Sequence, residues 1–158
     1  MSIPFNHTVS GAGVASGFSF TGRSNLGDVT PRSGDPVIIA LHGGTYSSEY
    51  FDIAGHSLLD NATKQGIAVI AIDRPNYVGS SALTSEGSII ADNATVLGDA
   101  IGSIFSAHGG NAAGVVLVAH SIGGAIATII AATPQTWPLL GLATSGCLVR
   151  VPAESAAD

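Results

Sequence analysis

Three short apolar runs constrain the fold of this chain more than any other feature of its sequence. They cover residues 37–41 (Val-Ile-Ile-Ala-Leu), 68–72 (Ala-Val-Ile-Ala-Ile) and 115–119 (Val-Val-Leu-Val-Ala). A strand with one face in water alternates apolar and polar residues, whereas each of these runs is continuous. The runs are therefore predicted to be strands that are buried on both faces, as in a parallel sheet covered by helices.

Helical spacing fills the two gaps between these runs. Residues 85–108 place apolar side chains three and four positions apart and are followed by Gly109, a residue type that commonly ends helices. Residues 48–66 are also expected to be helical, because small and apolar side chains recur there at a spacing of four: Ala54, Leu58 and Ala62. Each predicted strand is thus followed by a predicted helix.

The same alternation continues beyond the third run. A helix is expected over residues 125–132 and must stop near Pro134, and residues 139–143 form a fourth apolar stretch. Alternating strands and helices imply right-handed crossovers between parallel strands. The predicted fold class is therefore α/β, with a mostly parallel sheet and helices on both faces.

The length predicts one domain, with no linker and no internal repeat. Residues 14–20 alternate loosely with glycine and serine, so residues 1–35 are expected to form an antiparallel hairpin at the sheet edge. Residues 36–147 hold the parallel strand-helix units, and residues 148–158 form a small, polar tail. Residues 1–158 together are predicted to be a partial core that stops after the strand that follows the third helix.

The composition is poor in charge. Only 10% of the residues are charged, against about 25% in an average soluble domain, and 46% are hydrophobic. We expect much of the surface to be covered, either by further sequence, by a second copy in a homo-oligomer, or by a complementing chain. The net charge of −6 and the lack of a basic run argue against a nucleic-acid partner.

Composition also bears on the cellular compartment and on the metals and cofactors that the chain could bind. Cys147 is the only cysteine, which excludes an internal disulfide and predicts a cytoplasmic protein, and no apolar run reaches the roughly 20 residues of a membrane span. No metal is expected, because histidines and cysteines do not pair at ligand spacing. No nucleotide cofactor is expected either, because no glycine-rich phosphate loop follows a strand.

A serine follows the third run directly. The segment Ala119-His120-Ser121-Ile122-Gly123 leads from the predicted strand into the predicted helix. A serine in such a sharp turn needs small residues two positions before and after it, and its hydroxyl then stands above the sheet edge. The alternative is a purely structural tight turn that packs a helix on the sheet and carries no catalytic serine. The same loose pattern recurs around Ser155, but no strand precedes it there.

The first run ends in a second motif, His42-Gly43-Gly44-Thr45, and the second run ends in Asp73-Arg74-Pro75, followed by Gly79-Ser80. With the serine turn, these segments resemble the α/β-hydrolase superfamily, in its single-domain esterase/peptidase-like branch. The resemblance covers roughly residues 30–147. Ala119 departs from the strict Gly-x-Ser-x-Gly pattern of the family, which tolerates this small residue.

The resemblance implies a serine hydrolase that acts on a carboxylic ester or a related small-molecule acyl substrate without a cofactor. Ser121 would be the nucleophile, and the backbone N–H groups of Gly44 and Ile122 would hold the oxyanion. Gly43, Thr45 and His120 would complete this substrate-binding edge. Because the elbow carries a serine and not a carboxylate, the chemistry of epoxide and haloalkane hydrolysis is disfavoured.

The catalytic acid and histidine of the family come later in sequence than the nucleophile. Beyond Ser121 this chain has no histidine, and its only acids are Glu154 and Asp158. His42 and His120 occupy supporting positions in the family, and Asp73 is expected to tie its loop together. The triad partners are therefore predicted to lie outside these 158 residues. The alternative is a non-catalytic α/β-hydrolase-like protein that binds a ligand or a partner.

Overall fold

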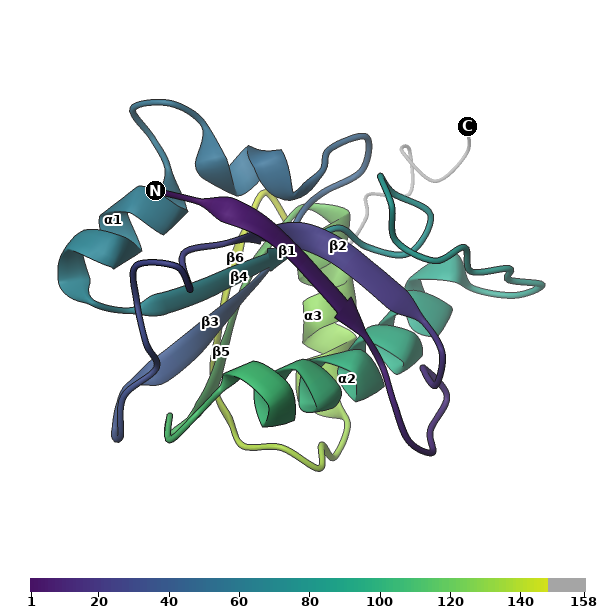
Figure 1. The fold of residues 1–158 in the computed structure, drawn as a ribbon. Coiled ribbons are helices and arrows are strands. Elements are labelled where there is room, and N and C mark those ends of the chain that lie inside the picture. The colour runs from purple at the N-terminus through teal and green to yellow at the C-terminus, as the bar shows by residue number, and fades with distance from the viewer. Residues whose placement is uncertain (148–158) are drawn as a thin grey trace.

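The computed structural model describes residues 1–147 (Figure 1). The predicted tail at residues 148–158, with Ser155, lies outside the described residues. One six-stranded sheet, in the order β1-β2-β4-β3-β5-β6, forms the centre of the molecule. The elements in chain order are β1 (Ile3–Thr8), β2 (Ser19–Ser24), β3 (Pro36–Leu41), the 3-10 helix η1 (Ser48–Asp52), α1 (Leu58–Gln65), β4 (Ala68–Ile72), α2 (Ile89–His108), β5 (Gly114–His120), α3 (Ile122–Ala132) and β6 (Leu139–Ser145).

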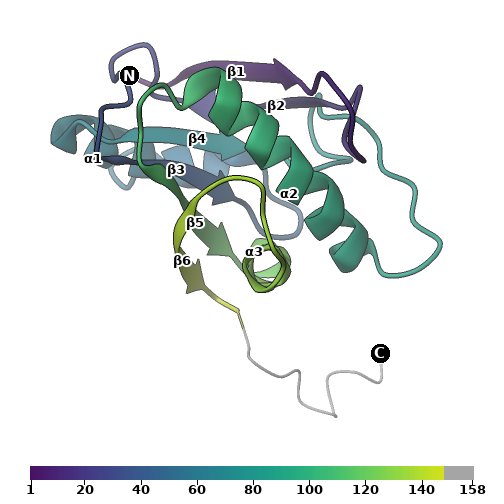
Figure 2. The same ribbon diagram turned by 90° about the horizontal axis from the view of Figure 1, so that it is seen from below.

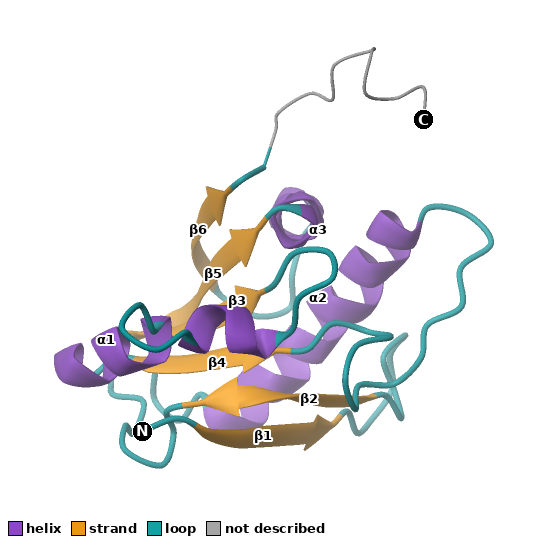
Figure 3. Ribbon diagram, turned by 90° about the horizontal axis from the view of Figure 1, so that it is seen from above, coloured by secondary structure: helices purple, strands orange, loops and turns teal. Residues whose placement is uncertain are grey.

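The four strands β4, β3, β5 and β6 are parallel, and β1 and β2 join them as an antiparallel hairpin at one edge. Figure 2 shows α2 and α3 crossing one face of the sheet, and Figure 3, from the opposite side, shows α1 and η1 over the other. The predicted α/β fold class, with a mostly parallel sheet and helices on both faces, is confirmed.

The core has one cluster on each face of the sheet. In β3, Ile39 and Leu41 pack with the cluster that includes α2 and α3, and Ala40 between them packs with Phe51 and Leu59 of the opposite cluster. Alternate residues of a strand point to opposite faces. A strand that contributes side chains to both clusters must therefore be apolar at every position. This is why the three apolar runs in the sequence are continuous.

The register brings the ends of the central strands to one level. Leu41, the last residue of β3, pairs with Ile72 at the end of β4 and with Ala119 near the end of β5. The loops that follow these three strands therefore meet at the same edge of the sheet, where ligands bind in open α/β folds.

The expected continuous helix over residues 48–66 was wrong at residues 53–57, which separate a 3-10 helix from a shorter α-helix. Only η1 and α1 are helical, and Ala54 is exposed in a turn between them, where Gly55 has φ +81°. The α-helix starts at Leu58 because the Ser57 side chain accepts a hydrogen bond from the Asp60 N–H and caps it. The spacing of four between Ala54, Leu58 and Ala62 therefore continues across a turn, at Gly55 and the cap Ser57, that interrupts the helix.

At both edges of the sheet, the strands differ in detail from what the sequence predicted. The second strand of the hairpin begins at Ser19, and residues 14–17 form a turn between Gly13 and Gly17, both at positive φ. At the other edge, β6 pairs only with β5 among the described residues, and its Leu140 and Leu142 side chains are exposed. No helix within residues 1–147 has the length and apolarity needed to cross a membrane.

Candidate active site

Ser121 forms the turn between β5 and α3 and has an unusual backbone. Its φ of 52° and ψ of −122° lie in a region that residues with a side chain rarely adopt. Its N–H donates to the Ser145 carbonyl (2.9 Å), and its own carbonyl accepts from the Gly124 N–H (2.8 Å). The hydroxyl does not cap the helix. The main chain is thus held on both sides, while no hydrogen bond with residues 1–147 engages the hydroxyl.

Small residues around Ser121 make this turn possible. Ala119 is buried at the end of β5. At Gly123, a β-carbon would lie within 2.5 Å of the His42 carbonyl oxygen and would overlap that of Leu41. The first turn of α3 therefore packs directly on the end of β3, which requires glycine at this position.

The loop after β3 lies against the serine turn. A β-carbon at Gly43 would be 3.1 Å from the Ser121 β-carbon, and one at Gly44 would be 3.2 Å from the Ile122 Cδ1 atom. The structure thus brings Gly43, Gly44, Ser121 and Ile122 together. Thr45 is turned elsewhere: it is exposed at φ 60°, and its N–H donates to the Tyr77 hydroxyl (3.4 Å).

His42 is fully buried and serves as a structural bridge. Its Nε2 atom accepts a hydrogen bond from the Arg74 N–H (3.0 Å), so its proton resides on Nδ1, which donates to the Gly43 carbonyl (2.8 Å). Burial, aided by the charge of Arg74, lowers the pKa of His42 to about 4. A neutral imidazole with both nitrogens engaged cannot accept the proton of Ser121.

Arg74 holds the same loop from below and was not singled out from the sequence as a site residue. Its guanidinium donates to the carbonyls of His42 and Gly43, both at 2.9 Å, and lies over the Tyr77 ring. Burial lowers the pKa of this guanidinium. The C=O of one residue and the N–H of the next point in opposite directions across a trans peptide. A Gly43 carbonyl turned toward Arg74 therefore directs the Gly44 N–H away from Arg74.

His120 lies beside the serine, but its ring is engaged by other groups. It stacks on Tyr50, with ring centroids 4.6 Å apart, and its Nδ1 atom pairs with the Ser145 hydroxyl (3.0 Å). Tyr46 stands at the edge of this stack. The two tyrosines, one just before η1 and one within it, form an aromatic wall that the sequence did not predict, because they belong to no motif.

The other histidines lie away from Ser121. His7 on β1 and His108 at the end of α2 face each other through ring nitrogens 3.2 Å apart, and His7 also pairs with Ser103 (2.9 Å). Burial lowers the pKa of both rings. His56 is exposed in the turn before α1. All five histidines of the chain fall within the described residues, and none forms a hydrogen bond with the Ser121 hydroxyl.

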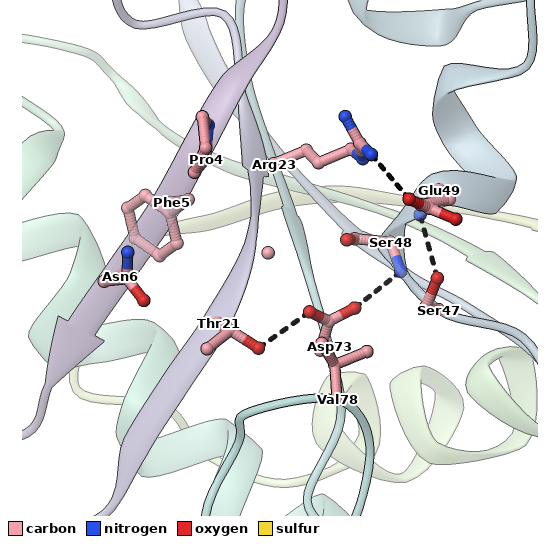
Figure 4. A pocket seen from close by; sticks show the side chains of 11 residues that line it. Pro4, Phe5, Asn6, Thr21, Arg23, Ser47, Ser48, Glu49, Asp73 and Val78 are labelled. Carbon is pink, nitrogen blue, oxygen red and sulfur yellow. Dashed lines mark hydrogen bonds and ion pairs between the residues drawn. The ribbon is translucent and has the colours of Figure 1, made fainter.

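Asp73 ties loops together, as expected. Its carboxylate accepts from the Thr21 hydroxyl and from the Ser48 N–H, both at 2.7 Å. Figure 4 shows these bonds at the base of a cavity of about 440 Å³ under the hairpin. There Arg23 is paired with Glu49 (2.6 Å), so the charged groups of this cavity are already satisfied within the protein.

A second cavity, of about 370 Å³, borders the serine turn itself. Ile122 lines it together with Ile89 and Ile90 of α2 and with the loop after β4. Across residues 1–147, no group of three histidine, cysteine, aspartate or glutamate side chains is arranged as metal ligands. The chemistry that this edge offers is therefore a serine hydroxyl, two backbone N–H groups and an apolar cavity.

Solved structures share this architecture at low sequence identity. A CIB-like hydrolase from Thermoplasma acidophilum superimposes with a TM-score of 0.66 at 18% identity, covering 93% of this chain and 64% of that one. An Aspergillus niger epoxide hydrolase gives 0.61 at 16% identity, with 96% and 36% covered. A bacterial membrane phospholipase A gives 0.64 at 19% identity, with 95% and 42% covered.

The chain thus spans between about a third and two thirds of the length of these structures. No curated protein matches it in sequence. A sequence model of the alpha/beta hydrolase family matches residues 38–156, which include the loop after β3, the loop after β4 and the serine turn. With this match and the fold together, the chain belongs to the alpha/beta hydrolase family.

Proposed function

We propose that this chain carries the nucleophilic half of a serine hydrolase that acts on a carboxylic ester or a related acyl compound. The observation that carries the proposal is Ser121, strained at φ 52° with an uncommitted hydroxyl beside Gly43 and Gly44. Strained residues that the surrounding structure holds in place concentrate at functional sites.

The reaction follows from the groups at this edge. The Ser121 oxygen attacks the acyl carbon, and its proton passes to a base as the C–O bond forms. The resulting oxyanion is held by the N–H groups of Ile122 and Gly44, while the ester oxygen leaves as an alcohol after protonation. Water then attacks the acyl-serine, releases the carboxylic acid and restores the hydroxyl.

Arg74 supports this role through the oxyanion loop. Its bond to the Gly43 carbonyl (2.9 Å) fixes the peptide that bears the Gly44 N–H. A donor that is already oriented does not have to reorganise when the negative charge develops. Arg74 is therefore a positioning residue in this proposal, and His42 is its partner.

The base and the acid of the triad are proposed to come from polypeptide other than these 158 residues. The rings of His42 and His120 are engaged by Arg74, Gly43, Tyr50 and Ser145, and the other three histidines lie elsewhere. The solved structures that share the fold have chains longer than this one. A serine hydroxyl without a base is a weak nucleophile, so activity depends on that supply.

A fluorophosphonate probe tests the nucleophile without requiring turnover. The chain would be treated with the probe over a series of free imidazole concentrations, since imidazole can stand in for the missing base. We expect an adduct on Ser121, located by peptide mass spectrometry, whose rate rises with imidazole. The Ser121→Ala variant should give none. No adduct on Ser121, with imidazole or in a longer protein that contains this chain, would refute the proposal.

A ligand-binding protein without catalysis is the second candidate, favoured by the absence of a hydrogen bond between any of the five histidines and the Ser121 hydroxyl in residues 1–147. It predicts equal ester turnover for the unaltered chain and for Ser121→Ala, in the presence or absence of imidazole. A rate that falls in the variant excludes it.

A further inference from the structure

A hydroxyl and two imidazoles form a chain of hydrogen bonds between β1 and α2, two elements that lie side by side in Figure 2. The Ser103 oxygen lies 2.9 Å from His7 Nε2, and His7 Nδ1 lies 3.2 Å from His108 Nε2. Within residues 1–147, no other serine or threonine hydroxyl is linked to two histidines in this way. A nucleophile bonded to a base, with the base bonded to a third group, is the arrangement that activates serine in enzymes.

The protons of this chain can be placed so that His7 acts as a base. We assign the Ser103 hydroxyl as the donor to His7 Nε2, because its proton has no other acceptor within residues 1–147. His7 then carries its own proton on Nδ1 and donates it to His108 Nε2. Burial lowers the pKa of both imidazoles below the ordinary value of 6.5. His7 is therefore neutral at pH 7 and able to accept a proton.

The Ser103 side chain points into a cavity of about 310 Å³. Five of the residues that line this cavity are spaced along one face of α2: Asp99, Gly102, Ser103, Ser106 and Ala107. Ser103 stands in the middle of this stripe, and His7 lines the same cavity from β1. Both side chains are only half-buried, so a small molecule in the cavity can reach the hydroxyl and its base together.

The wall of the cavity limits which acyl donors can react. It offers the hydroxyls of Ser10, Ser106 and Thr136 as hydrogen-bond donors. Rotatable hydroxyls must be oriented before they can stabilise an oxyanion, which pre-oriented backbone N–H groups avoid, so the ester needs a good leaving group of its own. Asp99, whose carboxylate accepts from the Ala15 N–H (2.9 Å), also lines the cavity and disfavours anionic donors.

We propose that Ser103 is a second nucleophile of this chain, activated by His7, and that it takes the acyl group of small, uncharged aryl esters. The Ser103 oxygen bonds to the acyl carbon while its proton passes to His7 Nε2, and His108 holds the imidazolium through its Nδ1–H. The bond to the aryl oxygen then breaks, and that oxygen takes the proton from His7. The products are acyl-Ser103 and a phenol. This reaction does not depend on Ser121 or on polypeptide beyond these 158 residues.

Phenylmethanesulfonyl fluoride, a small uncharged reagent, tests the nucleophile on the Ser121→Ala variant. The Ser103 oxygen would displace fluoride and keep a stable adduct, which peptide mass spectrometry locates. We expect this adduct on Ser103 without added imidazole, and Ser103→Ala should remove it. His7→Gln should lower the rate by about ten-fold or more, because it removes the base. His56→Gln, the same change at an exposed histidine before α1, should leave the rate unchanged.

The pH dependence of labelling gives a second readout with His7 in place, which keeps the test decisive if His7→Gln does not fold. His108 faces His7, and Asp99 lines the same cavity. The rate should rise with pH and level off below pH 6.5, where His7 becomes neutral, at pH values at which circular dichroism shows the chain to be folded. A purely structural His7 would give no such profile.

Three results would each overturn the inference: no adduct on Ser103, a rate that a folded His7→Gln variant leaves unchanged, or a rate without this pH profile. Because Ser121 is absent from the variant that is labelled, none of these results bears on the hydrolase proposed above.

Discussion

The two ends of the parallel strands are built differently. At the amino ends, positions with positive φ are occupied by glycine: Gly34, Gly66, Gly110 and Gly114. At the carboxyl ends, four residues with side chains adopt positive φ, and they account for every such residue in the part of the chain that the structure describes: Thr45, Asn76, Val78 and Ser121. The amino ends therefore use only glycine, which costs least in this conformation, whereas the carboxyl ends place four residues with side chains there besides Gly55 and Gly146.

The difference shows where the fold gives up stability. A non-glycine residue in a sparsely populated backbone region costs on the order of 1–3 kcal/mol. The same end exposes large apolar side chains, including Tyr46, Val78 and Ile122, that would ordinarily be covered. Glycine avoids this cost at the amino ends, whereas the carboxyl end keeps strain and exposed apolar side chains beside the proposed nucleophile. Four predictions test this contrast, from the largest effect to the smallest.

Gly123→Ala should have the largest effect, because its β-carbon meets backbone oxygens of Leu41 and His42 that cannot move independently. We expect about 3 kcal/mol or more of lost unfolding free energy in urea, together with loss of probe labelling at Ser121. Gly98→Ala in α2 is the control, since its β-carbon meets only the flexible Gln135 side chain, and it should change stability by no more than about 1 kcal/mol. Equal losses in both variants would contradict the close packing at the carboxyl end.

Acid should weaken the fold through His42. Its pKa is about 4 when folded, against an ordinary value of 6.5, so between these pH values the unfolded chain binds a proton that the folded chain does not. Stability is therefore full above pH 6.5 and falls as the pH drops toward 4, by up to about 3 kcal/mol.

Unfolding in urea at a series of pH values measures this slope, and His42→Gln should flatten it. His7 and His108 provide the comparison at the far end of the strands, because burial lowers the pKa of both in the same direction. A slope unchanged by His42→Gln would assign the acid sensitivity to His7 and His108 and not to the loop after β3.

Ser121→Gly and Gly66→Ala should change stability in opposite directions. Glycine relieves the strain at φ 52°, so Ser121→Gly should raise the unfolding free energy by about 1–2 kcal/mol while abolishing labelling. Gly66 caps α1 at φ 70°, so Gly66→Ala should lower it by a similar amount. Thermal melts of the two variants suffice, and a destabilised Ser121→Gly would show that the turn is not strained.

Val78→Gly should give the smallest effect. Val78 has φ 50° and is largely exposed, so glycine should stabilise the chain by about 1 kcal/mol. Val14→Gly is the matched control, an exposed loop valine without positive φ, and it should be neutral or lose about 0.5–1 kcal/mol. The melting temperature should rise in Val78→Gly and stay the same or fall in Val14→Gly. A change in the same direction in both variants would argue that side-chain exposure, not backbone strain, determines the effect.

The sequence predicted the features that depend on local pattern. Continuous apolar runs predicted the buried parallel strands, and small residues around Ser121 predicted a sharp turn between β5 and α3. The fold class followed from these alone. The prediction of one continuous helix at residues 48–66 failed, because a spacing of four between apolar residues does not reveal the turn at Gly55 or the cap at Ser57.

The parts that sequence reasoning missed depend on contacts between distant loops. Arg74 reaches the His42 and Gly43 carbonyls, and Tyr50 stacks on His120, only because β3, β4 and β5 end at one level. The buried Asn93 Oδ1 atom, which has no hydrogen-bond partner within residues 1–147, has no signature at all, because a missing partner becomes visible only when every neighbour is placed. The roles of these residues are defined by contacts, present or missing, with distant parts of the chain and not by residue type.

The hydrogen bond from the Ser121 N–H to the Ser145 carbonyl links the serine turn to a residue that the ribosome adds later. During synthesis, Ser121 leaves the exit tunnel before its acceptor does, so the strained turn has no anchor on that side until β6 has paired with β5. The geometry of the serine turn therefore depends on a strand that is made after it, and a chain that ends before β6 lacks this anchor.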